Sequence, residues 1–344
     1  MPRALPPSPA APDAPARAPG VRDIARIAGV SPMSVSRALN APHSVSEKTR
    51  ARVQAAIEST GFVGNRLASG LAASRSGLVG LIVPAIAGPV FQDLIQAVSR
   101  ELATQGFHVL LGQAGYGVQR EDELLEALLR RRPDGIILVG ITPSPAGRQK
   151  LLRLGVPTVE TWDLAEDPID LAVGFSHQAI AAAAAGHLVR AGCRRIAFLG
   201  GSHARARKRA QAFAQALAAH PGVQATAREL PAPAGVAGAR AALRALLAEV
   251  PELDGIFCSS DLIAYGVTLE AGMSGRPVPD ALKVLGLGDM PFSADVLPSI
   301  STVKINTGQI AQHAARHIAG RSQGQGPAHA RIDVGFSLLL RQSG

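Results

Sequence analysis

Between Ser31 and Arg37 the chain places hydroxyl, apolar and cationic side chains at the spacing of one helix face. Met33, Ser34 and Arg37 fall on the same side of such a helix, with Ser36 on its flank. An arginine can donate two hydrogen bonds to a guanine, and an apolar side chain can contact the methyl group of thymine. Serine hydroxyls bind phosphates. The face therefore has the chemistry of a surface that enters the major groove of DNA.

A first helix is predicted to support this face from behind. Ile24, Ile27 and Ala28 fall at i, i+3 and i+4, which gives the segment from Val21 one apolar side. Gly29 supplies the flexible residue at which that helix stops. The pattern therefore predicts a helix, a tight turn and a second helix.

The second helix is predicted to begin at Pro32. Ser31 can cap it, because its hydroxyl can accept a backbone N–H, and proline suits the first helical position. Val35 and Leu39 are four residues apart and are expected to face the core. Any helical hairpin at a protein surface could share these features, so the following residues are needed to decide.

A third helix and a short segment after it strengthen the interpretation. Ser46 is expected to cap a helix over Glu47–Thr60, and its Val53, Ala56 and Ile57 complete a three-helix core. Residues 65–73 follow, with two leucines at i and i+4 and a glycine between them. Such a segment is not stably helical alone, so a partner is expected to order it.

Composition bounds the class of protein. Three hundred and forty-four residues, 47% of them hydrophobic, allow more than one domain with sizeable cores. The net charge is +9, and residues 1–75 hold ten Lys/Arg against four Asp/Glu, a net charge of +6. This concentration of charge suits a polyanion, although a solvated basic face gives the same count.

The sequence also indicates where the protein acts. Cys193 and Cys258 cannot form a disulfide framework, and both adjoin predicted strands, as buried thiols do. No apolar run is long enough to span a membrane. Residues 1–20 are rich in Pro and Ala without a continuous apolar stretch, so a disordered tail is expected rather than a signal peptide. A cytoplasmic protein without membrane partners is expected.

From Leu78 short apolar runs alternate with amphipathic segments. The predicted strands are Leu78–Val83, His108–Leu111, Gly135–Val139, Thr158–Glu160, Arg195–Leu199, Gly255–Cys258 and Lys283–Leu287. The helices predicted between them include Val90–Gln105, Arg120–Arg132, Gln178–Ala191, Ala206–Ala219 and Ala237–Glu249. This alternation implies parallel sheets covered by helices on both faces, and the run is too long for one sheet of usual size. We therefore predict two Rossmann-like lobes.

Ligands of open parallel sheets bind beyond the carboxyl ends of the strands. Here those ends lead into residues 84–91, 162–163, 200–209, 259–261 and 286–289. One of these loops holds four cations, Arg205, Arg207, Lys208 and Arg209, between a strand and a helix. A solvated loop is the plain interpretation of such a run. Its position before a helix favours a seat for a carboxylate or a phosphate.

No catalytic set is apparent. Gly286-Leu-Gly288 lacks the third glycine of a dinucleotide loop. No motif pairs His177 with a nucleophile, so it is interpreted as a capping or core histidine, and Cys258 as a buried thiol at a strand end. We therefore expect no enzyme, no metal ion and no cofactor.

Residues 21–73 resemble the DNA-binding headpiece and hinge of the LacI/GalR family of bacterial repressors. The matching residues are Asp23–Ala25, Ala28–Ser31, Val35–Arg37, Asn40, Val45–Ser46, Thr49–Arg50 and Asn65–Arg66. The remainder resembles the family's effector domain, which is built like a sugar-binding protein, and most of all that of gluconate-utilisation repressors. This second likeness rests on Pro84, Val90–Phe91, Tyr116–Gly117, Val159–Glu160, Ala172–Phe175, Gly255–Cys258, Val278–Asp280 and Asp333–Leu338.

The resemblance implies an α/β protein with an N-terminal three-helix helix-turn-helix headpiece, a hinge and two Rossmann-like lobes of periplasmic-binding-protein type. The expected boundaries are a tail over residues 1–20, the headpiece over 21–64, the hinge over 65–77 and the effector and dimerisation domain over 78–344. Its lobes are expected at about 78–175 with 303–330, and at 176–302 with 331–344. No leucine heptads follow the predicted last strand, Ile332–Leu340, so a homodimer is expected rather than a tetramer.

The residues expected to contact DNA are Ser31, Pro32, Met33, Ser34, Ser36, Arg37, Arg50, Asn65, Arg66 and Leu71. Among these, Arg37 is the expected reader of a base. Five polar residues are expected to bind phosphates: Ser34, Ser36, Arg50, Asn65 and Arg66. The resemblance implies that Leu71 is a wedge in the minor groove at the centre of a palindromic operator.

By analogy with the family's cleft, the expected effector contacts are Phe91, Asp163, Arg205, Arg209, Ser260, Asp261 and Asp289. Phe91 would pack against the effector and Arg205, helped by Arg209, would meet its charge. The chain departs from the family where many relatives carry an Asp directly after a glycine and an aromatic residue. Here the acid comes one residue later, at Asp289, and the loop holding Arg205 looks one residue shorter.

The sequence thus predicts a transcriptional repressor of sugar-acid catabolism that a gluconate-like effector releases from DNA. A neutral sugar or a nucleobase as effector is the first alternative, and it would leave Arg205 without a charge partner. A cytoplasmic solute-binding protein or enzyme with an incidental helical headpiece is the second.

Overall fold

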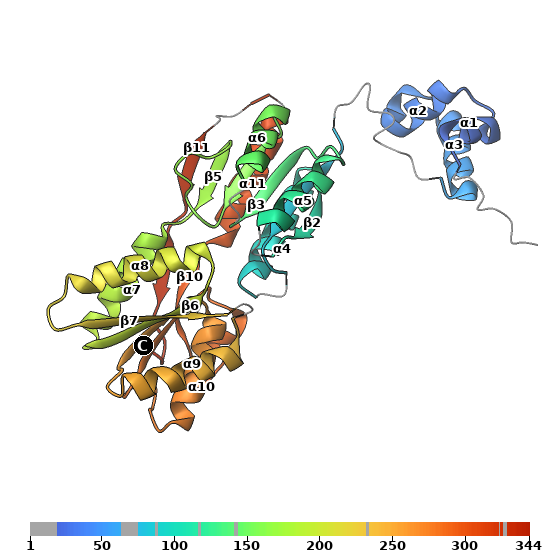
Figure 1. Cartoon of the computed structure of the whole chain (residues 1–344). Helices are drawn as coiled ribbons and strands as arrows, with labels where there is room; N and C mark the ends of the chain where they lie inside the picture. Colours follow the sequence, from blue (N-terminus) through green and yellow to red (C-terminus); the bar gives the residue numbers. More distant parts are fainter. Residues whose placement is uncertain are drawn as a thin grey trace, which may run out of the picture. The chain divides into compact units, whose positions relative to one another are not determined.

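The computed structural model describes residues 19–62, 75–86, 89–115, 118–140, 144–231, 234–322, 324–325 and 329–344 (Figure 1). The chain forms two compact units, Met1–Ser76 and Gly77–Gly344. Of the predicted tail over residues 1–20 and the predicted hinge over residues 65–77, residues 1–18 and 65–74 lie outside the described residues. No helix of the described part is long and apolar enough to cross a membrane.

The first unit contains the predicted three helices and a short turn of 3₁₀ helix. They are α1 (Val21–Ala28), α2 (Pro32–Asn40), η1 (Pro42–Ser44) and α3 (Glu47–Thr60). The predicted caps are confirmed, since the Ser31 hydroxyl accepts the Ser34 N–H at 3.1 Å and the Ser46 hydroxyl accepts the Thr49 N–H at 3.3 Å. Gly29 ends α1 in the left-handed region, with φ 61°, where a glycine is least strained.

The core of the headpiece is smaller than the spacing of its apolar residues suggested. Ile24, Val35 and Val53 are buried, and alanines of all three helices are packed around them. Ile27 and Leu39 are exposed, however, and for them the predicted core position is wrong. Both lie at the correct helical spacing, but three short helices cover only part of each apolar face.

The first lobe of the second unit is a six-stranded sheet in the order β11-β5-β4-β3-β1-β2, and every pairing in it is parallel. Its strands are β1 (Leu78–Val83), β2 (His108–Gln113), β3 (Gly135–Val139), β4 (Thr158–Thr161), β5 (Leu171–Gly174) and β11 (Ala330–Asp333). Its helices are α4 (Pro89–Thr104), α5 (Val118–Leu129), α6 (Pro145–Leu154) and α11 (Thr307–Arg321). Alternate residues of the strands pack on α4 with α11 and on α5 with α6, so both faces of the sheet are buried.

The second lobe is a six-stranded sheet in the order β12-β10-β9-β8-β6-β7. Its strands are β6 (Arg195–Gly201), β7 (Gln224–Leu230), β8 (Gly255–Cys258), β9 (Lys283–Leu287), β10 (Ser301–Ile305) and β12 (Phe336–Leu339). Its helices are α7 (His177–Arg190), α8 (Ala204–Ala218), α9 (Val236–Glu249), α10 (Asp261–Met273) and η2 (Pro291–Ala294). One apolar cluster joins the α4 face of the first sheet to the α7 and α8 face of the second, so the lobes share a core.

The crossings between the lobes correct the predicted boundaries. The predicted strand Ile332–Leu340 is two strands, because β11 pairs parallel with β5 of the first lobe and β12 pairs antiparallel with β10 of the second. The turn between them is made at Gly335, which has φ 65° and donates its N–H to the Asp333 carboxylate at 2.8 Å. The first lobe therefore takes α11 and β11, and β10 belongs wholly to the second lobe.

Candidate functional site

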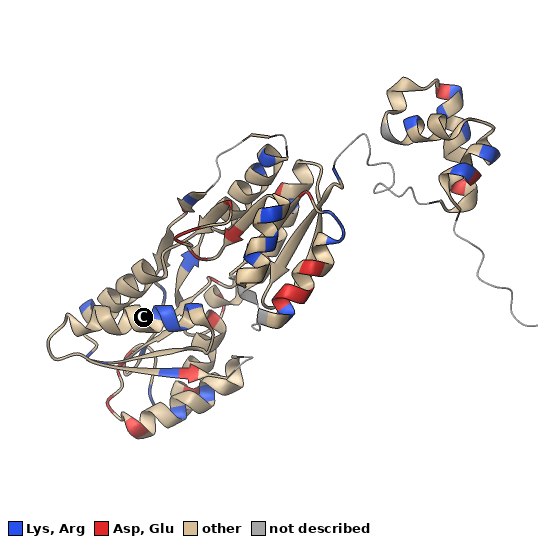
Figure 2. Cartoon of the chain, turned by 45° about the horizontal axis from the view of Figure 1, so that its top comes forward, with Lys and Arg blue, Asp and Glu red and all other residues tan. Residues whose placement is uncertain are grey.

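The second helix of the headpiece carries the predicted reading face. Met33 is 63% exposed, Arg37 is exposed, and Val35 points into the core, so α2 turns one polar and cationic side outward as predicted. Ser31 and Pro32 are exposed at the start of the helix. Basic residues lie on each of the three helices of this unit (Figure 2).

Of the other six predicted DNA contacts, the structure describes three. Arg50 is exposed on α3, with a guanidinium nitrogen 3.9 Å from the carboxylate of Glu47. Ser34 and Ser36 are half-buried, and the Ser34 hydroxyl lies 2.9 Å from that of Ser31. The remaining three, Asn65, Arg66 and Leu71, lie outside the described residues. The roles of all these residues stay predictions.

The four predicted cations lie on a helix rather than in a loop. The ring of His203 caps α8 by accepting the Ala206 N–H at 3.3 Å, so the helix begins at Ala204 and includes Arg205 through Arg209 in its first two turns (Figure 2). The start of a helix carries a partial positive charge, which disfavours cations and favours anions. This arrangement is unfavourable on its own, and a bound anion would relieve it.

Arg209 is the most buried of these cations, with 3% of its surface exposed. One terminal nitrogen lies 3.0 Å from Nδ1 of His177, and Nε has no hydrogen-bond partner among the residues that the structure describes. Burial, and secondly Arg205, lower the pKa of Arg209 to about 9, against the opposing effect of Asp163. A buried cation with an unsatisfied N–H is a strong attractor for a carboxylate.

Arg205 lies against the first lobe from its position on the second. A Cβ atom on Gly140, which directly follows β3, would come within 2.5 Å of the Arg205 guanidinium, so the guanidinium lies close against the backbone at this point. Burial and the neighbouring Asp122 raise the pKa of Glu121, whereas Arg205 acts to lower it. The side chain of Arg205 therefore lies where the strands of the first lobe end, as predicted for a ligand cleft.

The remaining two cations of α8 have carboxylate partners. Lys208 donates to the two oxygens of Asp163 at 2.9 and 3.2 Å, which joins the second lobe to the end of β4 in the first. Arg207 forms an exposed pair with Glu229 on the edge strand β7, with Nε 2.7 Å from the carboxylate. The structure thus brings Asp163, Arg205 and Arg209 together, and turns Arg207 away from them.

Phe91 lies in a row of aromatic rings. Its ring is buried and stands edge-on to that of Trp162 at 5.3 Å, and Trp162 stands edge-on to Phe175 at the same distance. Phe91 therefore forms part of the shared core beside the cation cluster. Its predicted packing against an effector is compatible with this position and stays a prediction.

Ser260 and Asp261 begin α10, and both have internal partners. The Ser260 hydroxyl caps the helix by accepting the Ile263 N–H at 3.3 Å. Asp261 is fully buried, and its carboxylate accepts hydrogen bonds from the Thr302 hydroxyl, the Met290 N–H and the Ser293 hydroxyl. These three bonds give the buried carboxylate a structural task, and its predicted bond to an effector hydroxyl stays a prediction.

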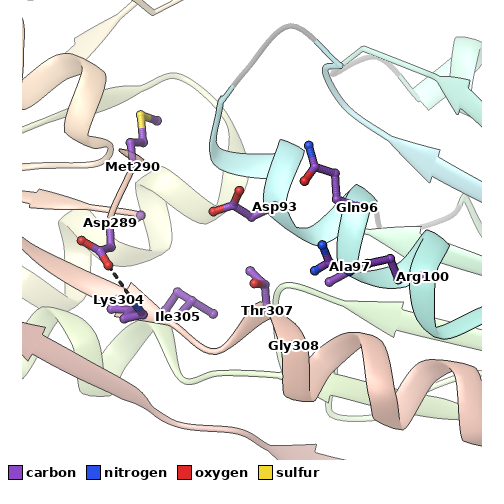
Figure 3. A pocket seen from close by; sticks show the side chains of 11 residues that line it. Asp93, Gln96, Ala97, Arg100, Asp289, Met290, Lys304, Ile305, Thr307 and Gly308 are labelled. Atoms are coloured by element: carbon purple, nitrogen blue, oxygen red, sulfur yellow. Dashed lines mark hydrogen bonds and ion pairs between the residues drawn. The ribbon is translucent and has the colours of Figure 1, made fainter. Parts of the chain in front are cut away.

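Asp289 lines a hollow of about 320 Å³ between the lobes. One wall of this hollow is α4, with Asp93 and Arg100. The opposite wall is formed by the β9–η2 turn, β10 and the start of α11, which contribute Asp289, Lys304 and Thr307 (Figure 3). Burial alone would raise the pKa of Asp289, but hydrogen bonds from Lys304 at 2.9 Å and from Arg341 at 2.6 Å lower it.

Two family models match this chain. That of bacterial regulatory proteins of the lacI family matches residues 21–65, and that of the periplasmic binding protein-like domain matches residues 185–344. A helix-turn-helix headpiece with an outward cationic helix, followed by two lobes with a cleft, defines a DNA-binding transcriptional regulator with a ligand-binding domain.

The relatives agree with this class. The HTH-type transcriptional regulator GntR of Pseudomonas aeruginosa is 33% identical over 330 residues, which are 94% of this chain and 95% of that protein. A crystal structure of a LacI-family regulator from Silicibacter pomeroyi has a TM-score of 0.86 at 30% identity, covering 94% of this chain and 98% of that one. The regulator GntR from Chromobacterium violaceum has a TM-score of 0.72 at 31% identity, covering 77% and 98%. This chain belongs to the LacI family, and it is a transcriptional regulator rather than an enzyme.

Proposed function

We propose that this regulator is a repressor of genes for sugar-acid catabolism and that a gluconate-like acid is its effector. The observation that carries the proposal is the buried guanidinium of Arg209, with its Nε unpaired among the described residues. A carboxylate would neutralise this charge and accept the free N–H, and the neighbouring start of α8 also favours an anion. Arg205, Asp163 and Ser260 are the proposed partners for the rest of a polyhydroxy acid, and Asp289 a more distant one.

The proposed repressor binds a palindromic operator as a homodimer, because two identical headpieces related by a two-fold axis require a two-fold site. The effector would favour one arrangement of the lobes and thereby move the hinges that follow the headpieces. It can do so only through a difference in affinity for the two arrangements. A release of tenfold to a hundredfold requires about 1.4–3 kcal/mol of coupling.

A neutral sugar is the second candidate effector. The solved complex of the regulator CelR with cellobiose, 26% identical with a TM-score of 0.68, is an example of a relative that holds an uncharged sugar. The buried charge of Arg209 argues against this candidate here, because a neutral ligand leaves that charge uncompensated.

The proposal is tested by fluorescence anisotropy on DNA fragments from upstream of this gene and its neighbours, with and without gluconate. The salt concentration is held constant near the physiological value, because phosphate contacts make affinity steeply salt-dependent. We expect tight binding to one fragment and its loss when gluconate is added. Tight binding that gluconate does not change, but a neutral sugar does, would favour the second candidate.

Replacing Arg37 with alanine is expected to lower the preference for operator over random DNA by about tenfold, since an arginine–guanine pair discriminates by about 1–3 kcal/mol. The matched control is Arg50→Ala on α3, which is expected to weaken both DNAs alike and to reduce the salt dependence by about one phosphate contact. Competition titrations at two salt concentrations measure both quantities. An unchanged ratio in the Arg37 variant would show that another side chain reads the base.

A further inference from the structure

His177 lies at the crossing from the first lobe to the second and contacts both. It is the first residue of α7, separated from the end of β5 by Phe175 and Ser176, and it is fully buried. Its Nδ1 lies 3.0 Å from a terminal nitrogen of Arg209 in the second lobe, and its Nε2 lies 3.0 Å from the backbone oxygen of Trp162 in the first. The carboxylate of Asp163 is farther from Nε2, at 4.0 Å.

The two partners determine where the proton of the imidazole lies. Arg209 can only donate a hydrogen bond and the Trp162 carbonyl can only accept one. Nδ1 of His177 must therefore be the acceptor and Nε2 must carry the hydrogen. Burial, followed by Arg209, Arg205 and Lys208, lowers the pKa of His177 to about 2, so the ring stays neutral and keeps this pair of bonds across the physiological pH range.

The residue that His177 contacts in the first lobe, Trp162, has a constrained backbone. Trp162 has φ 71°, a left-handed conformation that bulky residues rarely adopt. Its ring stands between Phe91, at the start of α4, and Phe175, which directly precedes the crossing. The carbonyl that accepts from His177 therefore belongs to a residue whose ring is packed between α4 and the crossing between the lobes.

We propose that His177 is a positioning residue, which holds the Arg209 guanidinium for an anion with one nitrogen and ties it to the first lobe through the Trp162 carbonyl with the other. This inference rests on the proposed anionic effector. It assigns a role to a residue that the sequence indicated only as a capping or core histidine. The effector bound at Arg209 would then act on the arrangement of the lobes through the His177 ring.

Two substitutions separate the two bonds. His177→Asn keeps an oxygen near the position of Nδ1, which can accept from Arg209, but it does not reach Trp162. His177→Gln keeps an N–H near the position of Nε2, which can donate to Trp162, but it removes the acceptor for Arg209. Both remove the ring, so a loss due only to packing will appear in both, and thermal melting of each full-length protein measures it.

Trp162 is the single tryptophan of the chain and is 4% exposed, so its fluorescence reports on the hydrogen bond between His177 and the Trp162 carbonyl without any ligand. In His177→Asn we expect acrylamide to quench the Trp162 fluorescence more readily than in the parent protein. In His177→Gln the quenching should equal that of the parent protein. With gluconate as the probe, His177→Gln should bind about tenfold more weakly, as for one lost bond to a charged group. His177→Asn should bind gluconate as the parent does, while the effect of gluconate on operator affinity falls about tenfold.

Equal quenching in both variants and the parent would overturn the proposal, whatever gluconate does. Equal losses in both variants with equally lowered melting temperatures would also overturn it, because the ring would then matter only for packing. If the quenching pattern is as expected but gluconate does not act on the parent protein, the tie made by His177 stands and the proposed effector is wrong.

Discussion

Replacing Arg209 with methionine is expected to abolish the response to a carboxylate effector while the protein stays folded. The substitution removes a buried charge that is not fully compensated, but it also leaves the buried Nδ1 of His177 without its donor, so the free energy of unfolding is expected to fall by no more than about 1–3 kcal/mol. Losing a desolvated charge pair weakens binding by about 3 kcal/mol, roughly a hundredfold. Titration calorimetry with gluconate and a melting curve test the two expectations together.

Arg207→Met is the matched control, because it removes a cation from the same helix whose exposed pair with Glu229 is directed away from the cluster. This control should bind gluconate as the parent protein does. An Arg209 variant that binds gluconate normally would contradict the proposed site. Arg205→Ala separates the remaining alternative, since a neutral effector predicts almost no change in affinity from that substitution.

Local signals were enough to predict the headpiece and most of the sheets. Ser31, Gly29 and Ser46 define the ends of helices through bonds that neighbouring residues make, so their spacing alone predicts the structure. The strands at the centre of each sheet, such as Gly135–Val139, are continuous apolar runs because helices cover both their faces. Three strands were not predicted, β5, β7 and β10, and of these β7 is an exposed edge strand without an apolar run.

The site was predicted only in part, because its decisive features are contacts between distant residues. The sequence indicated Arg205 and Arg209 as a pair of cations, but which of them is buried depends on how α7 packs against α8. His177 was interpreted as a capping or core residue, since no motif relates it to Arg209, which lies 32 residues later. A histidine that follows a serine cap at the start of a helix gives no signal for a bond across two lobes.

Asp261, which the analogy with the family's cleft suggested as an effector contact, also has an internal task that the sequence did not indicate. Its carboxylate joins α10 to β10 through Thr302 and to the β9–η2 segment through Met290 and Ser293. Gly286 allows this approach, since a Cβ there would collide with the carboxylate. Burial raises the pKa of Asp261 even though these three donors act to lower it.

We therefore expect Asp261→Ala to destabilise the second lobe by about 3 kcal/mol, because it leaves buried donors without an acceptor and opens a small cavity. Asp261→Asn keeps one acceptor oxygen and is expected to lose less, while Asp280→Ala, which removes an exposed carboxylate from the same lobe, is expected to lose almost nothing. Urea unfolding followed by circular dichroism measures the differences. If Asp261→Ala instead unfolds like the parent protein but loses affinity for gluconate, Asp261 belongs to the effector site and the internal bonds are dispensable.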